Sequence, residues 1–342
     1  MIAAFAALAA VATASGNGTH HGHFKPWANS THFTDLRTGR TLQHFTSWSN
    51  GTHFTDPATN QTVTHFDCDV HQGKATTHFN QTIKRLHNAH KNSAIGSRAP
   101  RKALAATGPT VPTSISIPLY IHVITTVAEA AANPITQAMA IAQSNELNTA
   151  YNPYGISFIL QNVSFTANDA WAVAAGTDMD AAKQALRVGS YSDLNLYFHT
   201  DLSGGALGTC TLPSQVDAGM PQSMYYTDGC NINANTMPGG TLTGYNMGKT
   251  AVHETGHWLG LLHTFEGYAC TGDGDSIADT PMESVSTNGC PTSPWKKSCP
   301  STPGNDPIHN YMDYSTDACY STFTPDQITR IATMWTQYRQ GM

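Results

Sequence analysis

Apolar side chains alternate with other residues along Ile115–Thr125, and this period of two predicts a β-strand. The same reasoning predicts strands at Ile156–Leu160 and Leu194–His199, and helices at Ile135–Tyr151 and Met179–Val188, where apolar residues gather near one helical face. Strands and helices that mix in this order predict an α+β fold, in which a twisted mixed sheet is backed by helices.

Tyr245–Leu259 has the pattern of a further helix, buried against that sheet. After it the regular pattern fades, and cysteine, glycine and proline become frequent. The sequence Thr324-Pro325-Asp326-Gln327 then begins a last helix, with Thr324 as its cap and Gln327 placed for a capping box. We therefore expect an irregular lower lobe that ends in a helix.

Residues 15–102 follow no such pattern. His-Phe occurs six times there, the first five copies fall into a 21-residue register, and the segment holds eleven of the 17 histidines. Biased, repetitive sequence with few aliphatic residues is usually disordered or loosely extended. We therefore divide the chain into a His-rich segment at 15–102 and a folded domain at 103–342.

Met1–Ala14 is an almost unbroken run of apolar and small residues, typical of a secretory signal peptide that is cleaved before Ser15. The run is too short to span a bilayer, and no later stretch reaches the required apolar length. We expect a secreted, extracellular protein with no membrane segment.

Cysteines and glycosylation sequons agree with export. Six cysteines in the C-terminal part form the even set expected of disulfides in an oxidising compartment, but the sequence alone settles no pairing. Cys68 is the seventh and lies alone in the N-terminal part. Acceptor triplets for N-linked glycans begin at Asn17, Asn29, Asn50, Asn60, Asn80 and Asn162.

Charge divides the chain unevenly. Residues 1–102 hold 10 Lys/Arg and 4 Asp/Glu, a net charge of +6, whereas the remainder holds 7 and 19, a net charge of −12. Opposite signs favour docking of the first part on the second, although salt weakens such long-range attraction. The acidic C-terminal part argues against nucleic acid as a partner.

The strongest chemical signal is the spacing of His253, Glu254, His257, Gly260 and His263. Residues four apart on a helix share a face, so His253 and His257 can hold one metal ion, and Glu254 can reach a water bound to it. Gly260 lets the backbone leave the helix, which brings His263 in as a third ligand. Three protein ligands and one position for water are typical of a catalytic zinc site, with Glu254 as the general base.

This spacing is the metzincin signature, which also requires a downstream methionine turn, and Asn310-Tyr311-Met312-Asp313-Tyr314 supplies one. Around both motifs the chain resembles the secreted fungal and bacterial metalloproteases related to the pappalysins. The matching runs are Tyr245–His253, His257–Phe265, Ala278–Pro281 and Asp306–Tyr314. The resemblance covers roughly residues 115–340 and fails before them.

The resemblance implies a metzincin-type zinc protease, with the sheet and its helices as an upper lobe and a disulfide-stapled lower lobe. It makes Tyr314 the donor that stabilises the oxyanion and Met312 an apolar floor under the zinc ligands. It offers Leu207–Leu212 as an exposed edge to which a peptide or protein substrate adds as a strand. The implied disulfides are Cys270–Cys299 and Cys290–Cys319, which leaves Cys210 with Cys230.

Three interpretations of residues 15–102 stay open. The segment is a glycosylated leader without chemistry, a removable pro-segment that keeps the protease latent, or an independent metal-binding tract. The second follows from the resemblance, since that family is made as zymogens. The dibasic pairs Lys84-Arg85 and Arg101-Lys102 are candidate cut sites.

Cys68 sharpens the zymogen interpretation. A thiolate from the pro-segment can occupy the fourth zinc position and displace the catalytic water. Asp67 or Asp69 can do the same through oxygen. The alternative is a cysteine with no role in latency, left over or paired between molecules.

Four acidic residues of the lower lobe suggest further roles. Asp273, Asp275 and Asp279 lie among glycine turns, where hard oxygen ligands suit calcium, although their spacing is not an EF-hand and solvated loop carboxylates are the alternative. The resemblance places Asp317 in the wall of the specificity pocket, where a carboxylate favours Arg or Lys after the scissile bond. Three histidines outside the motif are expected to be strand or loop residues and not ligands: His122, His199 and His309.

These patterns predict a monomeric, secreted zinc endopeptidase that is made as a zymogen. A zinc aminopeptidase is the alternative among enzymes, but the open edge strand and the lack of a visible acid for the substrate amine argue against it. A metal-binding or surface-interaction protein, in which the His-rich repeats are the working part, is the alternative from another class.

Overall fold

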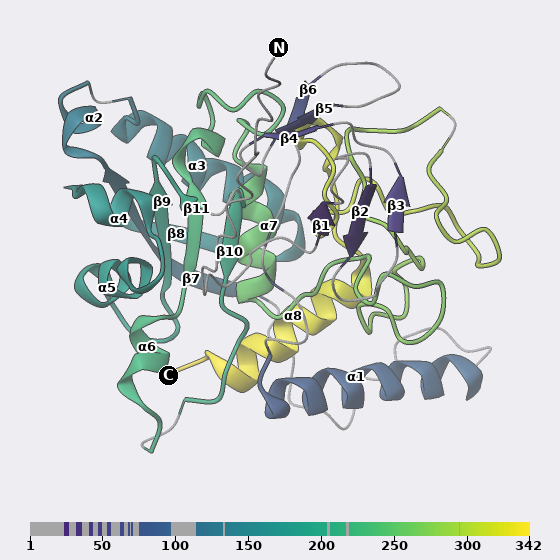
Figure 1. The fold of residues 1–342 in the computed structure, drawn as a ribbon. Coiled ribbons are helices and arrows are strands. Elements are labelled where there is room, and N and C mark those ends of the chain that lie inside the picture. Colours follow the sequence, from purple (N-terminus) through teal and green to yellow (C-terminus); the bar gives the residue numbers. More distant parts are fainter. Residues whose placement is uncertain are drawn as a thin grey trace, which may run out of the picture.

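The computed structural model describes residues 68, 70, 75–96, 114–132, 134–203, 206–216, 219–293 and 295–342, together with six short strands between residues 24 and 64 (Figure 1). Several expectations lie outside these residues and are not addressed by the structure. They concern the signal peptide at Met1–Ala14, Asp67, Asp69, the pair Arg101-Lys102, and the sequons at Asn17, Asn29, Asn50 and Asn60.

A five-stranded sheet with the order β10-β11-β9-β7-β8 forms the centre of the upper lobe. Its strands are β7 (Ile115–Thr125), β8 (Ile156–Ala167), β9 (Leu194–His199), β10 (Gly208–Cys210) and β11 (Cys230–Asn233). β7 pairs in parallel with β8 and β9, and β9 pairs in parallel with β11. Only β10, at one edge, runs antiparallel to its neighbour. The mixed sheet that the sequence predicts is therefore confirmed.

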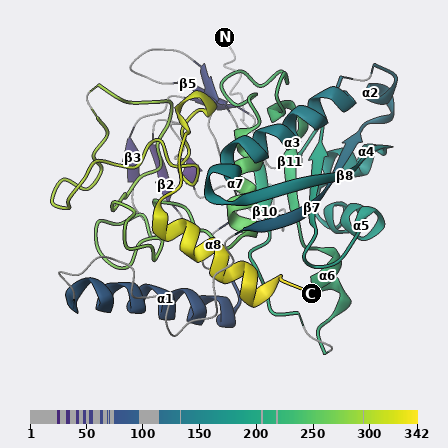
Figure 2. The same ribbon diagram turned by 180° about the vertical axis from the view of Figure 1, so that it is seen from behind.

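Helices cover both faces of this sheet (Figures 1 and 2). α3 (Gln137–Tyr151) and α7 (Lys249–Trp258) contact each other and pack on the face where Ile117–Val123 places its odd-numbered, fully buried side chains. α4 (Asp169–Val173) and α5 (Thr177–Leu186) cover the opposite face, around Tyr197. The alternation along β7 thus supplies both halves of the core.

The remaining short elements surround these layers. They are α2 (Val127–Ala132), α6 (Gln222–Tyr226), and the single 3-10 turns η3 (Asn152–Tyr154), η5 (Ala234–Thr236) and η6 (Asp317–Cys319). None of the helices in the described part of the chain is long and apolar enough to cross a membrane.

Two predicted boundaries differ from the structure for local reasons. β8 continues to Ala167 instead of ending at Leu160, because the pairing with β7 shifts register between Leu119 and Tyr120 and the simple alternation is lost there. α7 begins at Lys249 instead of Tyr245, because Gly248 has φ of 85°, outside the helical region.

The lower lobe carries almost no regular structure before its last helix. Between α7 and η6, the described residues form turns and isolated bridges. Disulfides join Cys270 to Cys299 and Cys290 to Cys319, the pairing that the resemblance implies, and a third joins Cys210 to Cys230 in the upper lobe. These crosslinks restrain a segment that has few backbone ladders of its own.

α8 (Pro325–Tyr338) begins with the predicted capping box, since the Thr324 and Gln327 side chains bond reciprocally to each other's backbone N–H groups. Just past its end, the Arg339 guanidinium donates to both carboxylate oxygens of Asp228 and lies 3.6 Å from the Trp258 ring centroid. Arg339 and Asp228 are both buried, so this ion pair holds α8 against α7 and the strand β11.

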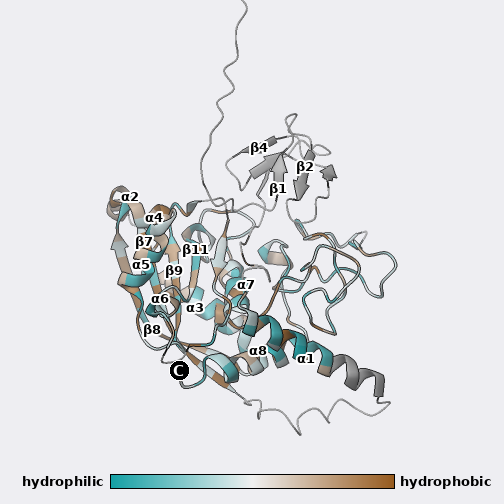
Figure 3. Cartoon of the chain, turned by 60° about the horizontal axis from the view of Figure 1, so that its bottom comes forward, coloured by the Kyte–Doolittle hydropathy of each residue, from teal (hydrophilic) through white to brown (hydrophobic). Residues whose placement is uncertain are grey.

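The sequence predicts that residues 15–102, called the leader from here on, are disordered or loosely extended, but the described part of the leader contains strands and a helix. Its described strands form two three-stranded antiparallel sheets, and the repeated His-Phe-Thr sequence lies in the central strand of each. The strands are β1 (Phe24–Pro26), β2 (His32–Asp35), β3 (Thr41–Gln43), β4 (Ser47–Ser49), β5 (His53–Thr55) and β6 (Thr62–Thr64). They are followed by α1 (Thr77–Gly96), a mostly hydrophilic helix beside α8 (Figure 3).

Candidate active site

α7 presents two imidazoles on one buried face. His253 and His257 are four residues apart, and their Nε2 atoms lie 3.0 Å from each other. Both side chains are fully buried, because α7 packs between the sheet and the lower lobe. The helix is able to approach the methionine turn closely at Gly256, where a Cβ would lie 2.4 Å from Met312 Sδ.

The chain leaves α7 at Gly260, whose φ of 93° is in the left-handed region that favours glycine. This turn returns the backbone toward the helix, so that His263 Nε2 lies 3.1 Å from His257 Nε2. A Cβ at Gly260 would also meet Met334 of α8 at 2.5 Å, which gives a second reason for glycine. The predicted trio of histidines is thereby brought together.

The other ring nitrogens hold the imidazoles in place. His253 Nδ1 lies 2.7 Å from Tyr311 O, and His257 Nδ1 lies 2.9 Å from Leu261 O, so each ring donates its Nδ1–H to a carbonyl. Burial lowers the pKa of His257 to about 4 and, with the neighbouring His257, takes the pKa of His253 well below its usual value. Neutral rings with Nδ1–H donated leave the Nε2 lone pairs facing one another.

The three nitrogens fit a zinc ion. Two nitrogens bound to tetrahedral zinc lie about 3.3 Å apart, given Zn–N bonds of roughly 2.0–2.1 Å, and the observed spacings are 3.0 and 3.1 Å. One ring nitrogen of each histidine and Cys68 Sγ all lie within 4.8 Å of one another. Imidazole and thiolate are ligands that zinc accepts.

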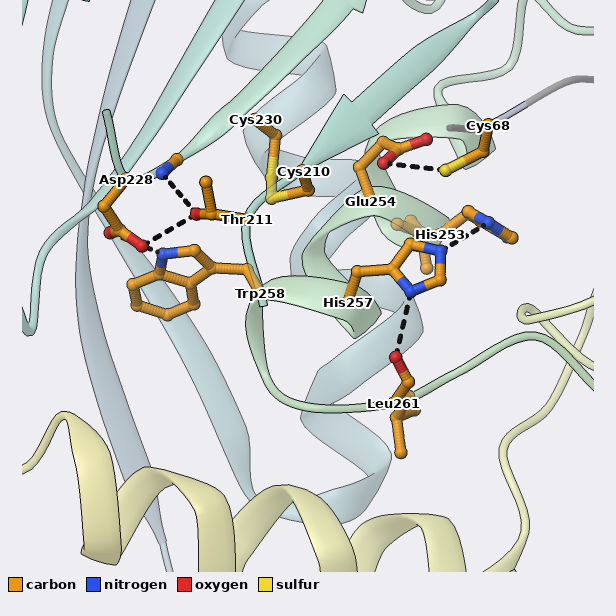
Figure 4. Close-up of a disulfide and its surroundings, with 12 residues drawn as sticks. Cys68, Cys210, Thr211, Asp228, Cys230, His253, Glu254, His257, Trp258 and Leu261 are labelled. Atoms are coloured by element: carbon orange, nitrogen blue, oxygen red, sulfur yellow. Dashed lines mark hydrogen bonds between the residues drawn. A yellow bond between two sulfur atoms is a disulfide. The ribbon is translucent and has the colours of Figure 1, made fainter. Parts of the chain in front are cut away.

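Glu254 lies beside this cluster, fully buried, where Figure 4 shows it with Cys68 and the histidines. Cys68 Sγ donates to Glu254 Oε2 at 3.3 Å. The strand β10 passes close to the carboxylate, and a Cβ at Gly208 would lie 2.4 Å from Glu254 Oε1. Gly208 therefore allows the edge strand and the acid to share this space.

Tyr314 and the backbone of Cys68 occupy the remaining side of the site. The Tyr314 hydroxyl accepts from Cys68 N at 2.9 Å and donates to Cys68 O at 2.7 Å. The Tyr314 ring lies edge-on to His263, with 5.0 Å between centroids. Cys68 also forms an isolated parallel bridge with Gly208 of β10. Cys68 thus lies between the edge strand and Tyr314.

Comparisons with known proteins agree with this geometry. Residues 177–335 match the family model described as pregnancy-associated plasma protein-A. An extracellular metalloprotease of Sordaria macrospora is 48% identical over 235 residues, which cover 69% of this chain and 80% of that protein. The chain belongs to the pappalysin family of metalloproteases. It is accordingly a metalloendopeptidase, which acts on proteins or peptides.

Other relatives and solved structures extend the comparison. An extracellular metalloprotease of Aspergillus oryzae is 48% identical over 256 residues, covering 67% of this chain and 79% of that protein. A promirolysin mutant of Tannerella forsythia matches with a TM-score of 0.60 and 26% identity, over 80% of this chain and 94% of that one. Mature mirolysin in complex with a cleaved peptide matches with a TM-score of 0.54 and 28% identity, over 67% of this chain and 94% of that one.

Asp317, predicted by the sequence analysis to lie in the wall of the specificity pocket, is held just before α7. Asp317 Oδ2 accepts from Met247 N at 2.7 Å, just before α7, and the side chain is buried. Its Oδ1 has no hydrogen-bond partner among the described residues. Burial raises the pKa of Asp317 to about 7. One oxygen thus orients the carboxyl, while the other remains available.

The three aspartates considered for calcium do not act as one group. Asp273 is half-exposed, and its Oδ1 lies 3.2 Å from His87 Nε2 of α1. Asp275 is buried, which raises its pKa to about 7. Asp275 Oδ2, Asp279 Oδ1 and Thr280 Oγ1 are buried without a hydrogen-bond partner among the described residues. The expected trio is therefore reduced to a cluster of two carboxylates and a hydroxyl.

Histidines outside the motif have structural surroundings. His122 bonds to Ser164 and Asn195, and burial lowers its pKa. His199 bonds to the Trp171 carbonyl and to Asn231, and burial lowers its pKa to about 4. His309 lies beside the Cys290–Cys319 disulfide. None of the three lies in the cluster around Glu254.

Two sequons lie within the described residues. Asn162 is exposed on the edge strand β8, whereas Asn80 is half-buried on α1 and its Nδ2 lies 3.5 Å from Ala75 O. Gly208 was not identified as a site residue by the sequence analysis. The one signal for it in the sequence is its position in the glycine-rich stretch before Leu212.

We predict that Gly208→Ala lowers kcat/KM about 100-fold, because a displacement of about 1 Å at a catalytic group has costs of this order and the new Cβ would displace Glu254. Peptide hydrolysis and thermal unfolding are measured together, and the unfolding midpoint should change little. Thr209→Ala, one residue further along β10, is the matched control and should keep its activity. Full activity in Gly208→Ala would show that the strand does not position Glu254.

Proposed function

We propose that this pappalysin-family protein is a secreted, glycosylated, monomeric zinc endopeptidase that is made as a zymogen. The observation that carries the proposal is the convergence of three buried imidazole nitrogens beside a buried glutamate. His253, His257 and His263 would hold the ion. Zinc bound there supplies positive charge that makes a water molecule more acidic and polarises the carbonyl of the scissile bond.

Glu254 acts as the base and then as the acid. Its carboxylate takes a proton from the attacking water, whose oxygen forms the new bond to the carbonyl carbon. The same proton then passes to the amide nitrogen as the C–N bond breaks, and the second proton of the water follows it to the released amine, so that the products are a carboxylate and an ammonium group. The Tyr314 hydroxyl, on the opposite side of the site, donates to the oxyanion that forms.

The strand β10 provides the place for an extended substrate. It is an edge strand of the sheet, and the Cys210–Cys230 disulfide fastens it to β11. Backbone groups on such an edge pair with a peptide of any sequence, so the chain on both sides of the scissile bond can continue. This openness favours an endopeptidase over an aminopeptidase.

Glu254→Ala tests the catalytic proposal. We expect a loss of activity of about 10²–10⁴-fold, the usual contribution of a general acid–base group, while bound zinc remains at one per chain. Peptide hydrolysis and elemental analysis of the same sample give both quantities. Glu129→Ala, remote from the site on α2, is the control. If proteolysis survives in Glu254→Ala, another residue is the base. A metal-binding function that resides in the His-rich repeats would not be affected by this substitution.

Latency follows from the position of Cys68. Its thiol bonds to Glu254, its Sγ lies among the three histidines, and its backbone engages the Tyr314 hydroxyl. All the groups that would act on a substrate are thus contacted by one residue of the leader. The leader serves as a pro-segment in this proposal, and its removal frees the site.

Cys68→Ala should raise the activity of the uncut chain. A hydrogen bond to a charged group contributes about 1.5–3 kcal/mol, so its loss corresponds to an increase of about 10- to 100-fold. Activity is followed before any shorter product appears on a denaturing gel. Gln81→Ala, exposed on α1, is the control. Unchanged latency in Cys68→Ala would reject the role of the thiol.

Asp317 is proposed to select Arg or Lys after the scissile bond, through the oxygen that has no partner. We expect cleavage of a peptide library to be enriched for these residues, and Asp317→Asn to lose the enrichment. Because the pKa of Asp317 is about 7, the carboxyl becomes neutral below that pH, and the preference should weaken as pH falls through 7. A hydrophobic preference in the unaltered protein would contradict the assignment.

A calcium ion is proposed at Asp275, Asp279 and Thr280, whose buried oxygens lack partners among the described residues. Binding to the folded state alone stabilises it by about 2.7 kcal/mol at a ligand concentration of 100 Kd. We therefore expect added calcium to raise the unfolding midpoint of the unaltered chain but not of Asp275→Asn. Asp273→Asn should keep the effect, because Asp273 faces His87. An equal rise in all three proteins would exclude this site.

A further inference from the structure

One face of the C-terminal region is covered by α1. We define the α8 face by Leu262, Met334 and Tyr338, which are buried and form one apolar cluster with Phe79 and Ile83 of α1. Phe79 and Ile83 are four residues apart and therefore lie on the same side of α1. Leu262 directly precedes the third histidine of the cluster, so the face begins next to the active site but on its outer side.

Polar groups at the rim of this cluster match as well. The Tyr338 hydroxyl lies 3.1 Å from Thr82 Oγ1 and 2.8 Å from His78 Nδ1. Gln337 Nε2 donates to the same Thr82 hydroxyl at 3.2 Å. Thr82 is buried and stands between Phe79 and Ile83 in the sequence, so these hydrogen bonds determine how the helix is placed.

The opposite side of α1 is polar. Gln81, Lys84 and Arg85 are exposed, and Arg85 donates an exposed hydrogen bond to Gln337 of α8. The helix is thus amphipathic, since Phe79 and Ile83 pack with residues of α8 and Thr82 bonds to Tyr338. Figure 3 shows the coloured part of α1 as mostly hydrophilic. Phe79 and Ile83 of α1 pack with Leu262, Met334 and Tyr338, whereas Cys68 bonds to Glu254 and Tyr314 in the cleft.

We propose that the α8 face is a binding surface for the amphipathic helix α1, and that it retains the leader on the catalytic domain after the chain between them is cut. The attachment is independent of Cys68. It goes beyond the proposed latency mechanism, because a leader bound at two places does not depart when one of them is lost. It also protects Lys84-Arg85, since a cut there requires the docked helix to open.

The test uses the full chain carrying Glu254→Ala, so its outcome does not depend on catalysis. A protease specific for dibasic pairs is added to cut at Arg101-Lys102, and the product is separated by size-exclusion chromatography. Mass spectrometry then measures how much leader elutes with the catalytic domain. We expect the leader to co-elute with the catalytic domain when Glu254→Ala is the only substitution, and also when Cys68→Ala is added. Adding Phe79→Asp instead should lower the co-eluting fraction at least about tenfold, because a charge replaces a buried aromatic side chain. Prompt release of the leader from the cut chain with an intact α8 face and an intact α1 would overturn the proposal. Release of the leader caused by Cys68→Ala alone would also overturn it.

A second measurement does not require the cut product. The rate of tryptic cleavage at Lys84-Arg85 in the uncut chain should rise at least about tenfold in Ile83→Ala, a milder change that opens a cavity in the docked surface. Gln81→Ala lies on the exposed side of the same helix and should leave the rate unchanged. Equal rates in Ile83→Ala and Gln81→Ala would show that the α8 face does not hold the helix.

Discussion

The burial of three imidazoles beside Glu254 is the condition on which the rest of the site depends. Burial removes these polar rings from water, and it favours the uncharged forms of His253 and His257 by lowering their pKa. Two backbone carbonyls accept the Nδ1–H groups of these rings, so the Nε2 lone pairs converge. Both carbonyls belong to segments that follow α7, so the site forms only when these segments have folded against the helix.

Two features hold those segments in place. Gly260 makes the turn that brings His263 back, and Met334 of α8 fills the space beside it. The buried pair of Arg339 and Asp228 then fixes the end of α8 to the loop before β11. Removal of one partner of such a pair typically costs about 3–5 kcal/mol, because a charge remains buried without compensation. The catalytic geometry is therefore supported by residues that never approach the substrate.

Residues of the leader contact two parts of the C-terminal domain. Cys68 lies between Glu254 and Tyr314, while α1 covers the outer face of α8. The composition of the leader does not predict the helix α1, because α1 carries few apolar residues and many polar ones. Phe79 and Ile83 stabilise the helix only through a partner that lies more than 170 residues later in the chain.

Elements whose signals are local could be predicted from the residues alone: the alternating strands at β7 and β9, the capping box of α8, and the spacing of histidines on α7. Periodicity and capping act over a few residues, so they can be recognised before any fold is known. Three features emerge only in the folded chain: Gly208 lies against Glu254, Asp273 lies beside His87 of α1, and part of the leader forms the helix α1. Each of these depends on contacts between distant segments, and no local pattern encodes which distant segment a residue will meet.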